Sequence, residues 1–249
     1  MEDLLFNNID FFLSFFFFFF IPQGYNELCE VGKTTETEEE TESDVKPLQK
    51  DNKLEKEKKE KKVEEYYNKR ILGAEKNRWK RGFGGEKIIS NLLLEKLPND
   101  YYVFNDVKLS NDKKPLQIDH LVLSRFGLFS IETKNWYGVV SGGENEDFIQ
   151  AGEQRTNPID QNKKHIKELA NRISIPKNKI FGIVCFANKY EDVKCIDIEK
   201  AENVCYEDDL VSRILFYQKI IISDEEVMKI GNDIVNTFNV GLNLSDIFI

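Results

Sequence analysis

The clearest pattern in the chain is a helical repeat of apolar residues that begins just after a glycine-rich turn. In the segment GFGGEKIISNLLLEKL, residues 82–97, apolar side chains recur at the spacing of one helix face: Ile88, Ile89, Leu92, Leu93 and Leu97. Pro98 follows directly, and a proline cannot continue a helix. The pattern predicts an amphipathic helix that packs this face against a core.

Short runs rich in β-branched and aromatic residues follow this helix and predict a series of strands. The expected strands cover residues 102–107, 116–124, 128–134, 139–141, 180–187 and 204–206. Pro158 suits the first position of a second helix, which runs to about residue 173. Two further amphipathic helices close the chain. This order of elements predicts an α/β fold, in which helices flank a mixed sheet.

The N-terminal 25 residues are dominated by a phenylalanine-rich apolar run from Phe11 to Ile21. The run extends back to Leu4 only by including Asn7, Asn8 and Asp10, whereas a spanning helix needs about 20 apolar residues. It also lacks the basic flank and the cleavage site of a secretory signal. Two interpretations stay open: residues 4–21 are a short or monotopic membrane anchor, or they are a low-complexity tail.

Charge divides the next segment, residues 26–81, into two parts. Six acids and no base lie between Glu36 and Asp44, which predicts a solvated linker. From Lys53 to Arg81, twelve Lys or Arg face six Glu, a net charge of +6, in a proline-free stretch of helix formers. We expect a long charged helix there. It is either an exposed helix held by pairs such as Glu55 with Lys59, or a basic arm that follows phosphates or anionic lipid.

These shifts in composition predict four segments. They are the apolar segment 1–25, the charged linker and basic helix 26–81, a folded domain 82–206, and a C-terminal helical extension 207–249.

Composition also narrows the function classes. A formal net charge of −9 argues against a general nucleic-acid coat protein, so any contact with nucleic acid is local. The four cysteines form no CxxC pair and the chain has two histidines, which argues against a structural zinc site. Cys185 and Cys205 lie in apolar runs, as reduced thiols do. This favours a reducing compartment, the cytoplasm, with or without the N-terminal tether.

The segment QIDHLVLSRFGLFSIETK, residues 117–134, carries the candidate chemistry. Its two β-rich halves flank a turn with Gly127, which predicts a hairpin centred between residues 125 and 126. Asp119 then lies opposite Glu132, and Gln117 lies opposite Lys134. Opposed Cβ atoms are about 4.5 to 5.5 Å apart, so the two carboxylates can share a hard cation with oxygen ligands.

Strand alternation assigns the side chains of this hairpin to two faces. One face receives Asp119, Leu121, Leu123, Glu132 and Lys134, and the other receives Ile118, His120, Val122, Phe129 and Ile131. Opposed like charges destabilise a sheet unless a cation, a pKa shift or a neighbouring lysine neutralises them. The alternative to a metal site is a solvated surface pair held by Lys134. His120 is expected to be a buried histidine that points away from Asp119.

Two polar residues on the flanking helices extend the candidate site. Glu86 falls on the apolar stripe of its helix, so it either points at the sheet or complements the helix N-terminus. Gln161 either donates into the cleft or is an ordinary exposed glutamine, and His165 lies one turn beyond it. Trp79, Trp136 and Tyr137 either stack on unpaired bases or pack in the core or its rim.

The motifs in this order resemble the nuclease-related domain family, NERD, which is related to the PD-(D/E)xK nucleases. The resemblance rests on GFGGE, then QIDH, then IETKN with Gly138, and then NP with Gln161 and His165, and it covers Gly82 to Ala187. It implies a restriction-endonuclease-like sheet. It also implies the catalytic residues, which are Glu86, Asp119, Glu132, Lys134 and Gln161.

The implied reaction is phosphodiester hydrolysis of nucleic acid, with DNA favoured, assisted by Mg²⁺ or Mn²⁺. We expect the side chains of Asp119 and Glu132 and the carbonyl of Thr133 to bind the ion, with Glu86 supporting a second ion or its water. Lys134 would orient the attacking water.

Two other functions stay open from the sequence. The same site could bind nucleic-acid ends without cutting them, or the chain could be a membrane-tethered module that recruits a partner. The sequence leaves the oligomeric state open.

Overall fold

A computed structural model describes residues 46–74, 76–109, 116–144, 146–187, 194–196 and 203–245, with side chains from Lys53 onward except at 194–196. The phenylalanine-rich segment 1–25 and the acidic stretch from Glu36 to Asp44 lie outside the described residues. In the described part of the chain, no helix has both the length and the hydropathy needed to cross a bilayer.

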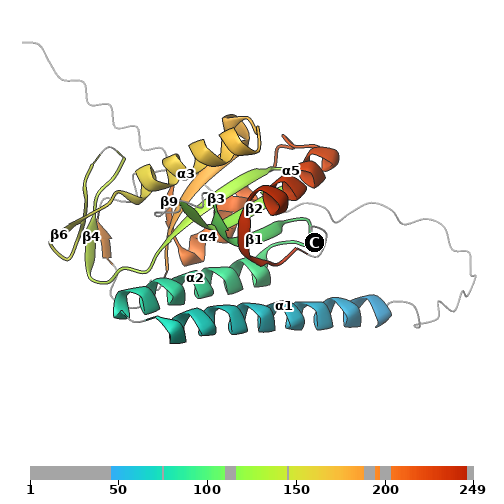
Figure 1. Ribbon diagram of the computed structural model, residues 1–249, viewed down its shortest axis with the longest axis horizontal. Helices are drawn as coiled ribbons and strands as arrows, with labels where there is room; N and C mark the ends of the chain where they lie inside the picture. Colours follow the sequence, from blue (N-terminus) through green and yellow to red (C-terminus); the bar gives the residue numbers. More distant parts are fainter. Residues whose placement is uncertain are drawn as a thin grey trace, which may run out of the picture. The chain divides into compact units, whose positions relative to one another are not determined.

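The core of the fold is a six-stranded mixed sheet with the strand order β10-β1-β2-β3-β7-β9 (Figure 1). Its strands span the following residues: β1 Tyr102–Lys108, β2 Gln117–Ser124, β3 Gly127–Lys134, β7 Ile180–Phe186, β9 Val204–Tyr206 and β10 Asn239–Asn243. Strands β10, β1, β2 and β3 pair antiparallel, whereas β7 pairs parallel with β3 and β9. The predicted mixed sheet with flanking helices is confirmed.

Helices cover both faces of this sheet, and an apolar cluster fills each interface. On one face, α1 (Lys46–Gly73), α2 (Asn77–Lys96) and α4 (Glu207–Phe216) contribute to one cluster with Val122, Phe129 and Ile131 of the sheet. On the other face, α3 (Pro158–Arg172) and α5 (Asp224–Thr237) pack on Leu121, Leu123 and Leu128. Because both faces of the sheet are covered, seven of the eight residues of β3 are buried, polar ones included.

A small second sheet extends one end of the domain. It has the strand order β6-β5-β4-β8. Its strands are β4 Val139–Ser141, β5 Phe148–Gln150, β6 Glu153–Arg155 and β8 Lys194–Ile196. A third apolar cluster joins it to the main sheet, because Val140 and Phe148 pack with Val184 and Phe186 of β7. A short 3-10 helix, η1 (Lys177–Lys179), leads into β7.

The helix α1 is part of the folded unit. Val63 and Tyr67 are fully buried against α2, while most of the charged side chains of α1 face solvent. The expected pair Glu55 with Lys59 is present, with 3.6 Å between the carboxylate oxygen and the ammonium nitrogen. Figure 1 shows α1 and α2 running side by side. Packing through two apolar residues therefore places α1 next to the sheet.

The predicted strands agree with the structure to within one residue at each end. The helix expected from Gly82 begins at Asn77, and the charged helix expected over residues 53–81 ends at Gly73. Four short strands were not predicted. The missed strands are β5, β6, β8 and β10. The strand β10, with the sequence NVGLN, pairs with the edge of β1. Its first residue, Asn239, is exposed, and the other four are only partly buried. Gly241 is required there, because an added Cβ would lie 2.1 Å from the Tyr66 hydroxyl and 2.7 Å from the Asp106 Cβ. Tertiary contact, and not local pattern, defines this strand.

Candidate active site

The predicted hairpin forms with the predicted register. Pairs run from Ser124↔Gly127 at the turn to His120↔Ile131, so the hairpin is centred between Arg125 and Phe126. Gly127 has a φ of 149°, and an added Cβ would lie 2.5 Å from a ring atom of Phe181. The turn chemistry read from the sequence therefore set the register of the two strands that carry the acids.

The ladder between β2 and β3 ends one residue before the two acids. Asp119 and Glu132 would form the next pair of this ladder. Instead, the side-chain Oδ2 of Asp119 accepts a hydrogen bond from the backbone N–H of Thr133, at 2.8 Å. A side chain therefore replaces the backbone pairing at this point. The strands separate here, and the carboxylates lie where they separate.

Two expectations about this hairpin were wrong. Gln117 does not pair with Lys134, because the ladder between β2 and β3 ends at His120↔Ile131. Ile118 packs in the same cluster as Leu121 and not on the opposite face. The cause lies in β1, where Asp106 has a φ of 54° between the pairs Asn105↔His120 and Val107↔Ile118. This left-handed residue breaks the alternation of both strands.

On the α3 face of the sheet, Glu132 and Lys134 meet two residues of α3. The Lys134 ammonium lies 2.6 Å from Glu132 Oε1 and donates to Gln161 Oε1 at 3.1 Å. His165 Nδ1 lies 3.4 Å from Glu132 Oε2, and burial lowers the pKa of His165 to about 4, so this ring is neutral at pH 7. The helix α3 therefore brings Gln161 and His165 to the acid and lysine of β3.

The start of α3 explains how these side chains are aimed. The Asn157 side chain accepts hydrogen bonds from the backbone N–H groups of Ile159 and Asp160, and Pro158 occupies the first turn. Asn162, fully enclosed, donates to the backbone carbonyls of Ser130 and Ile183. These bonds fix α3 on β3 and β7 and so set the direction of Gln161.

On the α2 face, Glu86 is 9% exposed and lies near enough to Asp106 and Glu132 for their charges to act on it. Burial and, next, the charge of Asp106 raise the pKa of Glu86 to about 7. The pKa of Asp119 is held well above its ordinary value by burial and then by the charges of Glu132 and Glu86. Burial also raises the pKa of Glu132, although Lys134 opposes that shift. Glu86 and Glu132, which are buried, and Asp119, which is half-buried, thus form one group of acids whose charges act on one another.

A second network, which sequence reasoning missed, holds Glu86 from behind. Arg70 of α1 lies 3.5 Å from Glu86 Oε2 and forms an ion pair with Asp106. Asp106 also accepts hydrogen bonds from the Tyr66 hydroxyl at 2.7 Å and from Gln117 Nε2 at 2.5 Å. The only sequence signal was an arginine and a tyrosine four residues apart on one helix face, in a helix otherwise dominated by lysine and glutamate.

His120 lies on the α2 side of the sheet, away from the acids, as expected. Its Nδ1 is 2.6 Å from Asn105 Oδ1, and Ser90 of α2 donates to the same oxygen at 3.2 Å. The side chain is fully buried, and burial lowers its pKa to about 3. A permanently neutral histidine held in this way is part of the core.

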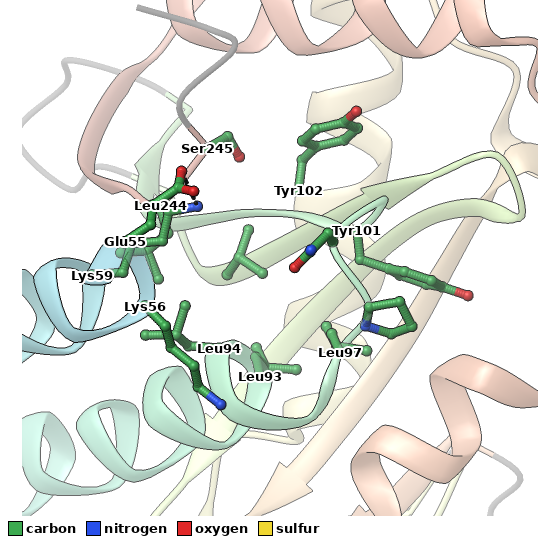
Figure 2. Close-up of a pocket in the computed structure, with 13 residues that line it drawn as sticks. Glu55, Lys56, Lys59, Leu93, Leu94, Leu97, Tyr101, Tyr102, Leu244 and Ser245 are labelled. Atoms are coloured by element: carbon green, nitrogen blue, oxygen red, sulfur yellow. Dashed lines mark ion pairs between the residues drawn. The ribbon is translucent and has the colours of Figure 1, made fainter. Parts of the chain in front are cut away.

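The aromatic candidates divide into two kinds. Trp136 packs edge-on against Phe148 and Phe186 and so joins the third apolar cluster. Trp79 and Tyr137 are both 51% exposed. A cavity of about 330 Å³ lies elsewhere, at the C-terminal end of α2 (Figure 2). Figure 2 shows its wall of leucines and α1 lysines, and none of the expected site residues lines it.

The acid group offers oxygen atoms of the kind that bind a divalent cation. Among the described residues, no three Asp, Glu, His or Cys side chains converge as a ready metal site in this conformation. Three buried oxygens around the group, however, accept no hydrogen bond from the described residues: Glu86 Oε2, which lies 3.5 Å from Arg70, Glu132 Oε2, which lies 3.4 Å from His165 Nδ1, and Thr133 Oγ1. Hard oxygens that repel one another suit Mg²⁺ or Mn²⁺. Asp119 and Glu132 could hold the ion, with Glu86 behind them.

Comparison with known proteins agrees with this geometry. Residues 81–187 match the nuclease-related domain, NERD. The chain belongs to the NERD family. An uncharacterized protein of Bacillus anthracis is 30% identical over 165 residues, which cover 64% of this chain and 76% of that relative. No solved structure gives a significant match.

The NERD match contains all the expected site residues, from Glu86 to Gln161. The PD-(D/E)xK nucleases are the known context of this family. The match does not include Tyr66 or Arg70, so part of the structure around Glu86 comes from α1, outside the NERD segment.

Proposed function

We propose that this chain is a nuclease that hydrolyses phosphodiester bonds of nucleic acid, with DNA favoured, and that its reaction depends on Mg²⁺ or Mn²⁺. One observation carries the proposal. Three interacting acids from α2, β2 and β3, two of them buried and Asp119 half-buried, lie near Lys134 at the point where two paired strands separate, inside a nuclease-related domain. Such a group is costly to bury unless it serves a charged ligand.

The acids Asp119 and Glu132 would hold the ion, and Glu86 would hold its water shell from the α2 side. When bound, the ion polarises a phosphodiester oxygen and lowers the pKa of a bound water. The acids otherwise repel a phosphate, so their charge must be offset before a substrate approaches.

Lys134 has two roles in this proposal. Its side chain is 15% exposed and its ammonium reaches Glu132 and Gln161, so Lys134 lies at the boundary between the acids and solvent. There it would orient the attacking water and offset negative charge that develops on the phosphate. Gln161, whose amide oxygen accepts from Lys134, would keep the ammonium in place.

The direct test is incubation of the full chain with single- and double-stranded DNA and RNA in Mg²⁺, in Mn²⁺ and in a chelator. We expect products only with a divalent ion, and none from the Asp119→Ala protein. Asp160→Ala is the matched control, because Asp160 is an exposed acid on the first turn of α3 and should not affect cleavage. Equal cleavage by wild type and Asp119→Ala, or cleavage in chelator, would contradict the proposal. Metal-dependent binding without any product would instead identify a binding module.

A further inference from the structure

The first turn of α2 exposes a run of basic residues around one aromatic ring. Lys76, Arg78, Lys80 and Arg81 are all exposed, and residues 76–81 contain no acid. None of the four forms an ion pair with an acid in the described part of the chain. The chain as a whole carries a net charge of −9, so this run is a local exception. Its charge suits a polyanion.

Two half-exposed rings accompany these charges. The Arg78 guanidinium carbon lies 5.5 Å from the Trp79 ring centre, and that of Arg81 lies 4.5 Å from the Tyr137 ring centre. Guanidinium groups beside aromatic rings form surfaces on which flat aromatic ligands stack. Trp79 and Tyr137 therefore present apolar faces to solvent within a cationic surface.

A hollow large enough for a base lies beside Trp79. Its volume is about 380 Å³, and it is lined by Gly73, Ala74, Lys76, Trp79 and Phe83, at the turn where α1 ends and α2 begins. This volume is within the range of about 300 to 1,000 Å³ that is usual for small-molecule sites. We call the hollow with its neighbours Arg78, Lys80 and Arg81 the elbow site.

The elbow site is joined directly to the acid group. Asn135, which follows Lys134, donates to the Arg81 carbonyl oxygen at 2.9 Å. The contact is close, because a Cβ on Gly85 would lie 2.7 Å from the Asn135 Cβ. Along α2, seven residues separate Trp79 from Glu86, which is about 10 Å at 1.5 Å per residue. A nucleotide chain can span that distance.

We propose that the elbow site binds an unpaired nucleobase of single-stranded nucleic acid, with the base stacked on Trp79 and the phosphates on either side met by the four basic residues. The role of this strand as a substrate rests on the function proposed above, but its binding does not. Unpaired bases are favoured over duplex because a stacked duplex hides the base faces that Trp79 could contact. They are favoured over an anionic membrane because an open hollow of about 380 Å³ beside one aromatic ring suits a single flat base, whereas a lipid surface would make no use of it.

Binding can be measured without cleavage, in chelator, with the full chain and a fluorescent oligothymidylate of about 12 nucleotides. Trp79→Ala should weaken binding about tenfold, the usual effect of losing one stacked base, while Trp79→Phe should keep most of the affinity. Phe216→Ala is the matched control, because Phe216 is an aromatic residue of α4 that is 81% exposed. Circular dichroism of each variant checks the fold.

A second variant tests the hollow without removing the ring or any charge. A Cβ built on Gly73 has no atom within 4 Å, and Gly73 is not among the glycines with positive φ. Gly73→Leu should therefore fold normally and fill part of the hollow. We expect it to weaken oligothymidylate binding several-fold, in the same direction as Trp79→Ala.

Salt dependence tests the phosphate contacts. Lys76→Ala with Lys80→Ala should reduce the slope of log affinity against log salt by about 1.4, since each phosphate contact on a single strand contributes about 0.7. The control is Lys58→Ala with Lys62→Ala, two exposed lysines of α1. An equal loss in the control would assign binding to the α1 surface and overturn the proposal.

Other outcomes also decide the question. Equal affinity for the duplex of the same length, unchanged binding by Trp79→Ala, or stronger binding to phosphatidylserine vesicles that Trp79→Ala abolishes would each overturn the elbow site. Absence of cleavage by every protein, with Trp79-dependent binding retained, would overturn the proposed nuclease and leave the elbow site supported.

Discussion

Two acids on neighbouring strands of this sheet, the buried Asp106 and the half-buried Asp119, have different surroundings. Asp106 of β1 is 1% exposed and has three donors, from Tyr66, Arg70 and Gln117. Asp119 of β2 accepts one described hydrogen bond, from the Thr133 N–H, and faces the other acids of its group. Both positions are acidic and both lie in the sheet. The difference is in the number of donors that surrounding elements supply.

This comparison separates a structural acid from a functional one. A buried carboxylate with a guanidinium, a phenol and an amide on its oxygens has its charge offset by the protein. A buried acid that faces two other acids does not, and its pKa rises until a cation or a proton offsets the charge. The position of an acid in the sequence does not distinguish the two cases. The hydrogen-bond and charge donors around it in the folded chain do.

The largest effect we expect concerns the lysine beside the functional acids. Lys134→Ala should slow metal-dependent cleavage by about 10²- to 10⁴-fold, the usual contribution of a group that assists proton transfer. Single-turnover kinetics would measure this loss. The matched control is Lys164→Ala, an exposed lysine of α3, which should cleave like wild type. A rate within a few-fold of wild type would remove Lys134 from the reaction.

The next effect concerns the structural acid. Asp106→Ala leaves Arg70 and its buried charge without its closest partner, which should lower the free energy of unfolding by about 3 to 5 kcal/mol. Urea denaturation in chelator would measure the change. Asp119→Asn serves as the contrast, because removing one of three repelling acids should leave stability equal or higher. If Asp119→Asn were the more destabilised protein, the assignment of the two acids would be reversed.

A third prediction concerns the buried histidine. Its folded pKa of about 3 lies below the ordinary 6.5, so the unfolded chain binds the extra proton between these values. Stability should therefore fall as pH drops from about 6.5 toward 3, and His120→Gln should remove about 2 to 4 kcal/mol of that fall. The raised pKa of Glu86, about 7, makes stability fall as pH rises from about 4.5 to 7, which opposes the effect of His120. The contribution of Glu86 is common to wild type and His120→Gln, so the difference in unfolding free energy between the two proteins isolates His120.

This difference curve can be measured by urea denaturation at several pH values. If the difference in unfolding free energy did not change between pH 3 and 6.5, His120 would have the same pKa in the folded and unfolded chain, and the prediction would be wrong. Asn105→Ala, which removes the partner of the ring, should not flatten the wild-type slope, because burial and not the hydrogen bond lowers the pKa.

The smallest effect is the response to metal. An ion that binds only the folded state adds about 1.4 kcal/mol at ten times its dissociation constant. Thermal unfolding with and without Mg²⁺ should show this gain in wild type and none in Asp119→Asn. Asp209→Asn, a change to an exposed acid of α4, should keep the gain. An equal gain in all three proteins would place the ion outside the acid group.

Much of the fold followed from local pattern. Turn chemistry around Gly127 predicted the hairpin and its register, and apolar spacing predicted α2 and the buried side of Glu86. The segment from Pro158 was predicted as a helix because a proline suits the first helical position, and the structure adds Asn157 as its cap. These signals are short in range, so a single sequence contains them in full.

Other features depended on contacts between distant parts of the chain. The strand β10 forms because β1 offers an open edge, and its own sequence has little β character. The left-handed Asp106 shifted the faces of Ile118 and Gln117, and the donors that hold it lie about 40 residues earlier on α1. No local pattern in β2 could reveal that change.

The amino-acid sequence by itself determined the order of elements, the hairpin register and the identity of the acids and lysine, because each depends on neighbours within a few residues. Only the tertiary structure decided which acids have donors, which rings stay exposed and where α1 meets Glu86. Those outcomes depend on charges and contacts supplied by elements far apart in the chain, and the pattern within one short segment carries no information about them.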